Sequence, residues 1–391
     1  MDRTHRLFSA AFILCLVALC GAGFLHAGEN PPETGLKISI QPWKEARELF
    51  RGDPCWLGGD GASSVELGDG RVLWLFGDSF IDPSGSGSRH NATIVRNSVA
   101  IQTGYRPETA RMSFSWKVLG NRPRAMFREE GEDWFWPGSG IRLGDALLVF
   151  LVRTGWSDNA LGFEATGWKA VLVPNPDSTP TLWGMIPLEK PATRGVLVGS
   201  ASALALDGFL YAFGSDTKGE AVHAVRWPLA EAATGSPAAP PRWMVPDRQW
   251  VRNLALNEKP VPVFQGGQVE FTVHYESDLK VFLQVQTLSL LEPCLAVRVS
   301  PAVSRSWSQP ACFYRPPEGA SSGLLIYAGK AHKVFEGTDL AFTYAVNTTS
   351  AEQLMNDMEL YYPVVLKGEI LVKRHDGRPE PCSGSEAIPA P

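Results

Sequence analysis

Residues 58–80, GGDGASSVELGDGRVLWLFGDSF, decide the predicted fold. The run ASSVEL alternates small or apolar with polar residues, and Gly68-Asp69-Gly70 supplies turn chemistry. The following run, RVLWLF, is rich in the branched and aromatic residues typical of strands. We therefore predict a β-hairpin, and the rest of the chain is interpreted outward from it.

The hairpin brings two aspartates together. If the loop is the three residues 68–70, Leu67 faces Arg71, and counting outward on that register places Asp60 opposite Asp78. Directly opposed residues have Cβ atoms roughly 4.5 to 5.5 Å apart, and like charges so placed are destabilising. Two carboxylates in one site push their pKa values apart, so one can hold a proton while the other stays ionised. The alternative is that these aspartates only cap loops, and a bulge or a two-residue loop would shift the register.

Composition and charge narrow the class of protein. The 391 residues are 44% hydrophobic, with 38 Gly, 30 Pro and 13 Trp, and this composition predicts a globular chain with many turns and few long helices. The formal net charge is −5 and no basic block is present, so we expect no nucleic-acid partner.

The first residues are typical of a secretory signal. Arg3, His5 and Arg6 precede an apolar run from Leu7 to Leu25, and small residues follow. We predict a signal peptide over residues 1–27 and a secreted or periplasmic protein, with no membrane contact after its removal. A retained membrane anchor and lipid attachment at Cys20 are the alternatives.

Four cysteines lie outside this signal, and an even number in an exported chain permits two disulfides. We favour Cys294 with Cys312. We also favour Cys55 with Cys382, because the repeats described next predict a closed ring fold, which brings the chain ends together. The sequence has no CxxC pair and no HExxH, so a zinc site is unsupported, and we predict no metal site and no cofactor. A metal on the axis of the fold is the alternative that the sequence leaves open.

The order of glycines, strand, turn and apolar strand recurs along the chain. Copies begin near residues 60, 138, 200, 268 and 321. Four-stranded units repeating about every 50 to 80 residues are typical of a β-propeller. We predict an all-β, five-bladed β-propeller over residues 53–373, with four-stranded antiparallel blades around a central funnel, a lead-in over 28–52 and a tail over 374–391. Residues 43–50 are the helix-like exception.

The propeller predicts a ring of polar groups where the first strand of each blade begins. Ser139, Ser200 and either Gln268 or Glu270 would join Asp60 around one funnel, a natural site for a small ligand. Small residues can instead serve only to let strands crowd around an axis. Glu270 is either a solvated edge charge or a third carboxylate.

Aromatic and basic residues complete the candidate binding site. Sugar recognition needs flat apolar faces, and the aromatics nearest to the predicted blade rims are Trp56, Trp134, Trp136, Tyr327 and Tyr362. Lys330 and His332 would pair with a carboxylate or hold a substrate hydroxyl, although a lone His is more often structural. The sequence has no GxSxG elbow and no GxGxxG or P-loop pattern before a helix.

Several motifs together resemble one bacterial family. They are, in this order, the hairpin sequence above, RNSVAI, WSQPACFYRPP, IYAGKAH and ELYYPVV, and the resemblance covers about residues 53–365. The family consists of exported five-bladed propellers, mostly catalogued as a domain of unknown function, and some members are endo-D-arabinanases. In the active members, as the resemblance implies, two aspartates of the first blade carry catalysis, and the matching positions are Asp60 and Asp78.

These observations predict a monomeric, secreted glycoside hydrolase acting on a polysaccharide, with an arabinan-type glycan implied by the resemblance. Asp60 and Asp78 would act as an acid/base or acid/nucleophile pair. The alternative is a propeller that binds carbohydrate without cutting it, and a third class is a protein-interaction propeller. The sequence leaves the order of the two aspartate roles open.

Overall fold

The structure is a computed structural model. It describes residues 36–159, 162–188, 194–217, 221–233, 240–252, 254–255, 258–289, 293–321, 323–373 and 379–381. The predicted signal peptide, most of the predicted C-terminal tail and Cys382 lie outside these residues. Within the described part, no helix is long and apolar enough to cross a membrane.

The opening hairpin forms as predicted and belongs to a four-stranded antiparallel sheet. Glu66 pairs with Val72 and Ser63 with Leu75, which is the register inferred from the sequence. Only the turn differs, because Gly68 pairs with Arg71 after a bulge and leaves Asp69 and Gly70 as the loop. The strands are β3 (Ser63–Gly68), β4 (Arg71–Phe76), β7 (Ser98–Thr103) and β8 (Arg111–Ser115).

Three further antiparallel sheets follow in chain order, each built from consecutive strands. The first contains β11 (Trp134–Leu143), β12 (Ala146–Trp156), β13 (Phe163–Val173) and β14 (Ile186–Leu188). The next contains β15 (Ser202–Leu206), β16 (Phe209–Ser215), β17 (Ala221–Pro228), β18 (Arg242–Met244) and β19 (Trp250–Val251), with β20 (Phe264–Gln265) paired to β17. The third contains β21 (Thr272–Glu276), β22 (Val281–Thr287), β23 (Leu295–Ser300) and β24 (Ala311–Tyr314).

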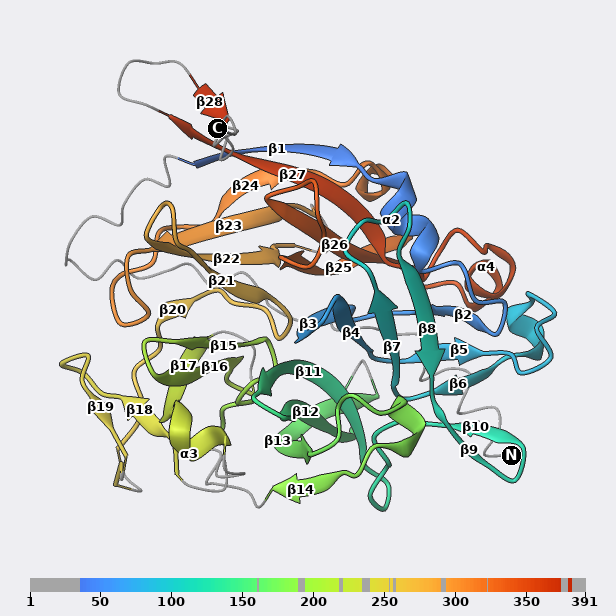
Figure 1. The fold of residues 1–391 in the computed structure, drawn as a ribbon, viewed down its shortest axis with the longest axis horizontal. Coiled ribbons are helices and arrows are strands. Elements are labelled where there is room, and N and C mark those ends of the chain that lie inside the picture. The colour runs from blue at the N-terminus through green and yellow to red at the C-terminus, as the bar shows by residue number, and fades with distance from the viewer. Residues whose placement is uncertain are drawn as a thin grey trace, which may run out of the picture.

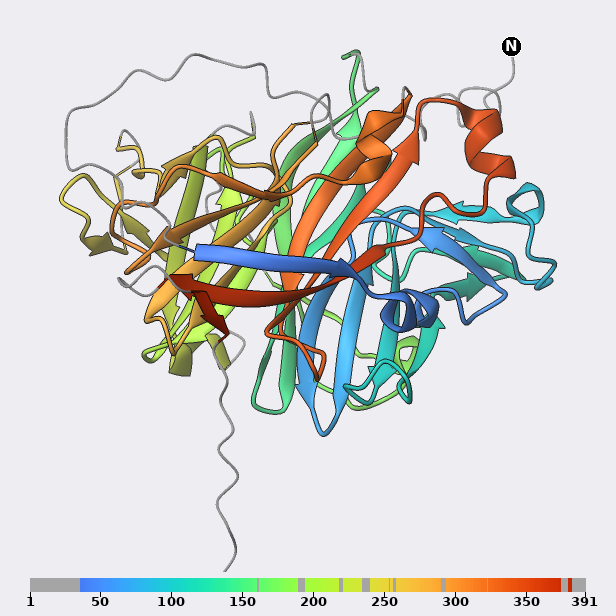
Figure 2. The same ribbon diagram turned by 90° about the horizontal axis from the view of Figure 1, so that it is seen from above.

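The last large sheet joins the two ends of the chain. It contains β25 (Leu324–His332), β26 (Leu340–Thr348), β27 (Val364–Lys373) and the N-terminal strand β1 (Leu36–Pro42), with β28 (Pro379–Pro381) paired to β27. β1 runs antiparallel along β27 from Leu36 opposite Val372 to Pro42 opposite Leu366, and Figure 2 shows the two strands side by side. The predicted lead-in therefore contributes a strand to the sheet that closes the fold.

Smaller elements connect the sheets. Two small sheets pair β2 (Trp56–Gly59) with β5 (Ser79–Ile81) and β6 (Thr93–Val95), and β9 (Lys117–Leu119) with β10 (Arg122–Arg124). Among the described residues, the helices are α2 (Lys44–Leu49), which the sequence predicted, α3 (Leu229–Ala233) and α4 (Ala351–Asn356). The 3-10 turns are η1 (Arg89–Asn91), η2 (Pro180–Leu182) and η4 (Pro317–Ala320).

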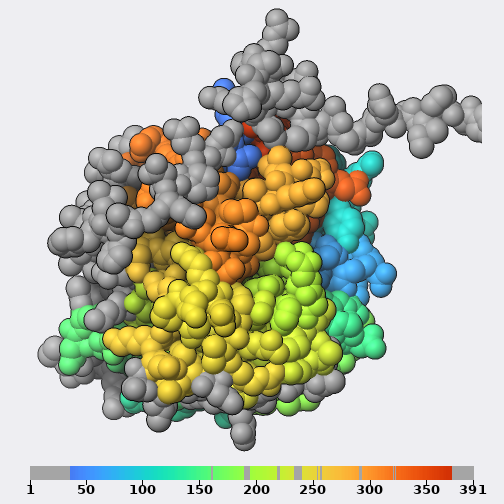
Figure 3. Space-filling model, turned by 90° about the vertical axis from the view of Figure 1, so that its left-hand side faces the viewer, coloured from blue at the N-terminus to red at the C-terminus, as the bar shows by residue number. Residues whose placement is uncertain are grey.

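The first strands of the large sheets form a ring. β3 contacts β11, β11 contacts β15, β15 contacts β21, and β21 contacts β25. A 2.7 Å hydrogen bond between Ser64 Oγ in β3 and His332 Nδ1 in β25 closes the ring. Figure 1 shows the sheets arranged around this centre, and Figure 3 shows one outer face, where β15–β19 and β21–β24 pack side by side. The fold is therefore an all-β propeller.

The core lies between neighbouring sheets. One buried cluster joins β3 and β4 to β12 through Val65, Leu73 and Val149, and a second joins β12 to β16 through Phe150 and Ala212. Equivalent clusters fill the remaining gaps around the ring. Because most sheets are covered on both faces, their middle strands are nearly continuous apolar runs.

Candidate functional site

The two aspartates of the first repeat face each other as the sequence predicted. Asp60 follows β2, and Asp78 lies between β4 and β5. The Asp60 N–H donates to Asp78 O at 3.4 Å, and the Gly77 N–H donates to Asp60 O at 2.9 Å. A Cβ atom on Gly77 would lie 2.5 Å from Asp60 Oδ1. Only glycine therefore leaves room for the Asp60 side chain.

Asp60 is bound by two phenols. Its Oδ2 accepts hydrogen bonds from Tyr327 Oη at 2.8 Å and from Tyr361 Oη at 3.2 Å. Burial, followed by the nearby carboxylates of Asp78 and Glu270, raises the pKa of Asp60 to about 7, although both phenol hydrogen bonds act in the opposite direction. Asp60 therefore carries its proton for a substantial fraction of the time at neutral pH.

Asp78 has a different environment. Its Oδ2 accepts a hydrogen bond from Arg96 Nη1 at 3.1 Å, and its Oδ1 accepts one from Trp136 Nε1 at 2.9 Å. Burial raises the pKa of Asp78, while the Arg96 charge and both hydrogen bonds act to lower it. Burial has the larger effect, so the pKa of Asp78 is raised overall, but a guanidinium and an indole N–H both stabilise a carboxylate, and Asp60 has neither.

A third carboxylate lies at the same site. Glu270 Oε1 accepts a hydrogen bond from Lys330 Nζ at 2.8 Å, and Lys330 Nζ also donates to Gly61 O, next to Asp60. The Lys330 side chain is buried, whereas that of Glu270 is 24% exposed. Among the described ion pairs, Arg96 balances Asp78 and Lys330 balances Glu270, so Asp60 is the carboxyl without a cationic partner.

A β-bulge aims two of these side chains at the aspartates. Tyr327 pairs with Ala345, but Lys330 pairs with Thr343, so β25 has one residue more than β26 over this stretch. In a regular strand, residues three apart point to opposite faces. The extra residue lets Tyr327 reach Asp60 while Lys330 reaches Glu270 and Gly61.

Four sequence-predicted residues come together with the aspartates: Trp136, Glu270, Tyr327 and Lys330. Two serines lie deeper between the sheets. Ser139 Oγ donates to Gly199 O at 2.7 Å, and Ser200 is 2% exposed. Gln268 Nε2 donates to Leu288 O. Ser139 and Gln268 therefore bond within the propeller rather than to the aspartates, and the buried Ser200 Oγ has no hydrogen-bond partner among the described residues.

Three other predicted binding residues are part of the core and need correction. Trp56 is fully buried, stacks on Phe114 with centroids 4.3 Å apart and donates to Ser98 Oγ. Tyr362 is 6% exposed and packs edge-on against Trp56. His332 is 1% exposed and bonded to Ser64 and Thr343, and burial lowers its pKa, so it is a neutral structural residue.

Sequence reasoning missed two residues that contact the aspartates. Tyr361, rather than its neighbour Tyr362, reaches Asp60, and its φ of 66° lies in the left-handed region. Arg96 lies in the RNSVAI motif that contributed to the family resemblance, but its charge was not used.

The cysteines and the glycosylation sequon Asn347-Thr348-Thr349 add two findings. Cys294 and Cys312 form the expected disulfide, and Cys55 is a free cysteine among the described residues. Its predicted partner, Cys382, lies outside them. Asn347, in a glycosylation sequon, is 3% exposed, and its Nδ2 donates to Tyr327 Oη at 3.4 Å. It therefore supports the phenol that binds Asp60.

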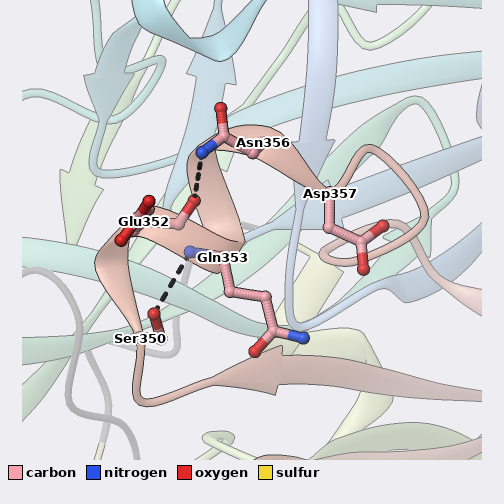
Figure 4. A pocket seen from close by; sticks show the side chains of 5 residues that line it. All are labelled: Ser350, Glu352, Gln353, Asn356 and Asp357. Atoms are coloured by element: carbon pink, nitrogen blue, oxygen red, sulfur yellow. Dashed lines mark hydrogen bonds between the residues drawn. The ribbon is translucent and has the colours of Figure 1, made fainter.

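Among the described residues, no group of three or more His, Cys, Asp and Glu side chains is placed to hold a metal ion. An open recess over α4 is lined by Ser350, Glu352, Gln353, Asn356 and Asp357 (Figure 4). Several of its polar side chains already have partners: Ser350 Oγ accepts from the Gln353 N–H, Gln353 Oε1 accepts from Thr348 Oγ1, and Asn356 Oδ1 is bonded to His90 Nε2. The aspartate pair, where carboxyl, phenol, indole and guanidinium groups from several sheets converge, is the stronger candidate site.

The fold and site define a propeller with a buried pair of carboxyl groups near its centre. The chain belongs to the family described as Domain of unknown function (DUF5005), whose model matches residues 44–363. No curated protein matches it.

Solved structures with similar folds are known. A crystal structure of a provisionally named hydrolase from Bacteroides ovatus ATCC 8483 has a TM-score of 0.67 and 16% identity, covering 86% of this chain and 92% of that chain. An exo-1,5-alpha-L-arabinanase from a bovine ruminal metagenomic library has a TM-score of 0.44 and 10% identity, covering 84% and 98%. The first of these likenesses shows the fold alone.

Proposed function

We propose that this protein is a glycoside hydrolase in which Asp60 is the general acid and Asp78 is the ionised partner. The observation that supports it is the unequal environment of two opposed carboxyls: phenols and no cation at Asp60, a guanidinium and an indole N–H at Asp78. Different environments push the pKa values of two carboxyl groups apart, so that one site can hold both an acid and a base.

The geometry suggests which oxygen transfers the proton. Asp60 Oδ2 already accepts two phenol hydrogen bonds, so the proton is carried on Oδ1. Oδ1 lies next to Gly77 and near Trp136, since a Cβ atom added to that glycine would lie 2.5 Å from Oδ1 and 3.6 Å from Trp136 Cδ1. Asp60 protonates the leaving oxygen as the glycosidic C–O bond breaks. In the same step, Asp78 either bonds to the anomeric carbon, giving a glycosyl-enzyme that water later hydrolyses with Asp60 as base, or takes a proton from the water that attacks that carbon.

The substrate class rests on the sequence resemblance to a family that includes endo-D-arabinanases, so arabinofuranose polymers are the first substrates to test. We also infer that the ring has five blades, one for each large sheet described above. Export from the cytoplasm remains a proposal based on residues 1–27, and the Cys294–Cys312 disulfide supports it because disulfides persist in oxidising compartments.

A glycan panel tests the proposed function. The protein is incubated with arabinans, arabinogalactans and other plant and bacterial polysaccharides, while new reducing ends and retention in glycan-containing gels are both measured. Release of reducing ends from at least one glycan is the expected result. Retention without any release would instead identify a carbohydrate-binding propeller.

The pH profile of activity is expected to fall on its basic side near pH 7, because Asp60 loses its proton there. Tyr327→Phe removes a hydrogen bond that favours the Asp60 carboxylate, so the basic limb of kcat/KM should move to higher pH. Tyr105→Phe is the matched control, since Tyr105 Oη donates to Glu66 Oε1 at 2.7 Å on the surface. Equal profiles for all three proteins would contradict the assignment of the acid.

A further inference from the structure

Four aromatic side chains gather at one end of the second large sheet, beside Asp78. Trp134 and Trp136 are two residues apart in β11 and therefore share a face. Trp134 is opposite Thr154 in β12, and Thr154 shares a face with Trp156, two residues further along that strand. Trp156 is in turn opposite Phe163 in β13. The strand register thus places all four rings on the same face of the sheet.

The rings contact one another. Centroids are 5.9 Å apart for Trp134 and Trp136, 5.0 Å for Trp134 and Trp156, and 5.1 Å for Trp136 and Phe163. Trp134 is 3% exposed and forms the floor, whereas Trp156 is 45% exposed. Trp136 and Phe163 have intermediate exposure. The cluster therefore forms one partly exposed aromatic surface, with the exposed Trp156 ring against the buried Trp134 ring.

Two direct links connect this cluster to the proposed catalytic pair. Trp136 Nε1 donates to Asp78 Oδ1 at 2.9 Å. The Arg96 guanidinium, which donates to Asp78 Oδ2, lies 4.3 Å from the Trp134 centroid and 5.6 Å from that of Trp156. The aromatic surface is therefore continuous with the site where bond cleavage is proposed.

We propose that Trp136, Trp156 and Phe163, on the Trp134 floor, form a platform that binds a sugar unit of a glycan chain next to the bond that is cut. This inference rests on the proposed function and extends it, because it makes the substrate an oligomer or polymer. Flat aromatic faces bind the apolar faces of sugar rings, and the Arg96 guanidinium supplies hydrogen-bond donors at the platform edge. The occupant is a neutral glycan chain.

Trp156→Ala removes the exposed ring of the platform. We expect the ratio of kcat/KM on long to short arabinofuranose oligosaccharides to fall roughly tenfold, mainly through KM, because loss of a stacked aromatic contact weakens binding by about this order. Trp250→Ala is the matched control: Trp250 lies 4.6 Å from the Arg226 guanidinium and 5.8 Å from Tyr211, in the next sheet. It should leave the ratio unchanged.

Calorimetric binding of the same oligosaccharides to Asp60→Asn, with and without Trp156→Ala, separates the two proposals. Weaker binding of the long oligosaccharides by the double variant supports the platform even if the parent protein cuts none of them, a result that would count against the proposed function alone. The platform proposal would be overturned if Asp60→Asn bound the long oligosaccharides equally well with and without Trp156→Ala. It would also be overturned if Trp156→Ala lowered kcat/KM by the same factor for oligosaccharides of every length.

Discussion

Asp78→Asn is expected to fold like the parent protein and to lose about 10³-fold or more of its glycosidase kcat/KM, because the ionised partner of the acid is gone. Asn retains an oxygen that can accept from Trp136, but its neutral amide cannot replace the carboxylate that Arg96 pairs with. Initial rates of reducing-end release, with circular dichroism to check the fold, measure this loss.

Two further variants control that experiment. Asp207→Asn changes an exposed aspartate in the turn between β15 and β16, where φ is 49°, a region that Asn tolerates well. It should keep full activity. Asp60→Asn removes the other carboxyl without touching Arg96, so it tests the pair independently should Asp78→Asn fold poorly. Parent-like activity in a folded Asp78→Asn protein would be incompatible with the proposed mechanism.

Arg89→Met is expected to cause the largest loss of stability, about 3–5 kcal/mol, because it leaves several buried carbonyls without donors. Arg89 is fully buried. Its guanidinium donates to Leu57 O at 3.0 Å, Leu354 O at 2.6 Å and Asp357 O at 3.0 Å, and also to Leu360 O. Burial lowers the pKa of Arg89 only to about 10, so the side chain stays charged at neutral pH.

This arginine also supports the site, since Leu360 precedes Tyr361, whose Oη reaches Asp60. Urea unfolding of Arg89→Met measures the stability loss. Arg248→Met is the control, because Arg248 is exposed and donates to Ser304 O at 2.8 Å, so its loss should cost less than about 0.5 kcal/mol. Similar unfolding free energies for the two variants would contradict this account of Arg89.

The pairing of Asp60 with Asp78 was predictable because strand periodicity and turn chemistry are local. The turn itself was wrong by one residue, yet the register held, since the bulge between Glu66 and Gly68 offsets the shorter loop. The order of glycines, turns and apolar strands similarly sufficed to predict an all-β propeller. Both rest on short-range patterns that a single sequence displays.

Which residues form the site was harder to predict, because this depends on the local backbone conformation, which the chemistry of the side chains does not specify. In the ELYYPVV motif, a positive φ at Tyr361 turns that ring to Asp60 and leaves Tyr362 in the core. The bulge between Tyr327 and Lys330 is equally hidden. Trp56 was misassigned because distance from a strand end does not reveal which rings neighbouring sheets bury.

The most direct test of the central claim compares the parent protein with an Asp60→Asn/Asp78→Asn double variant on arabinan at neutral pH. New reducing ends are counted over time at equal protein concentration. Our account predicts release by the parent and none above background by the double variant, with both proteins equally folded. Release at the same rate by both proteins, or glycan binding without release by either, would contradict it.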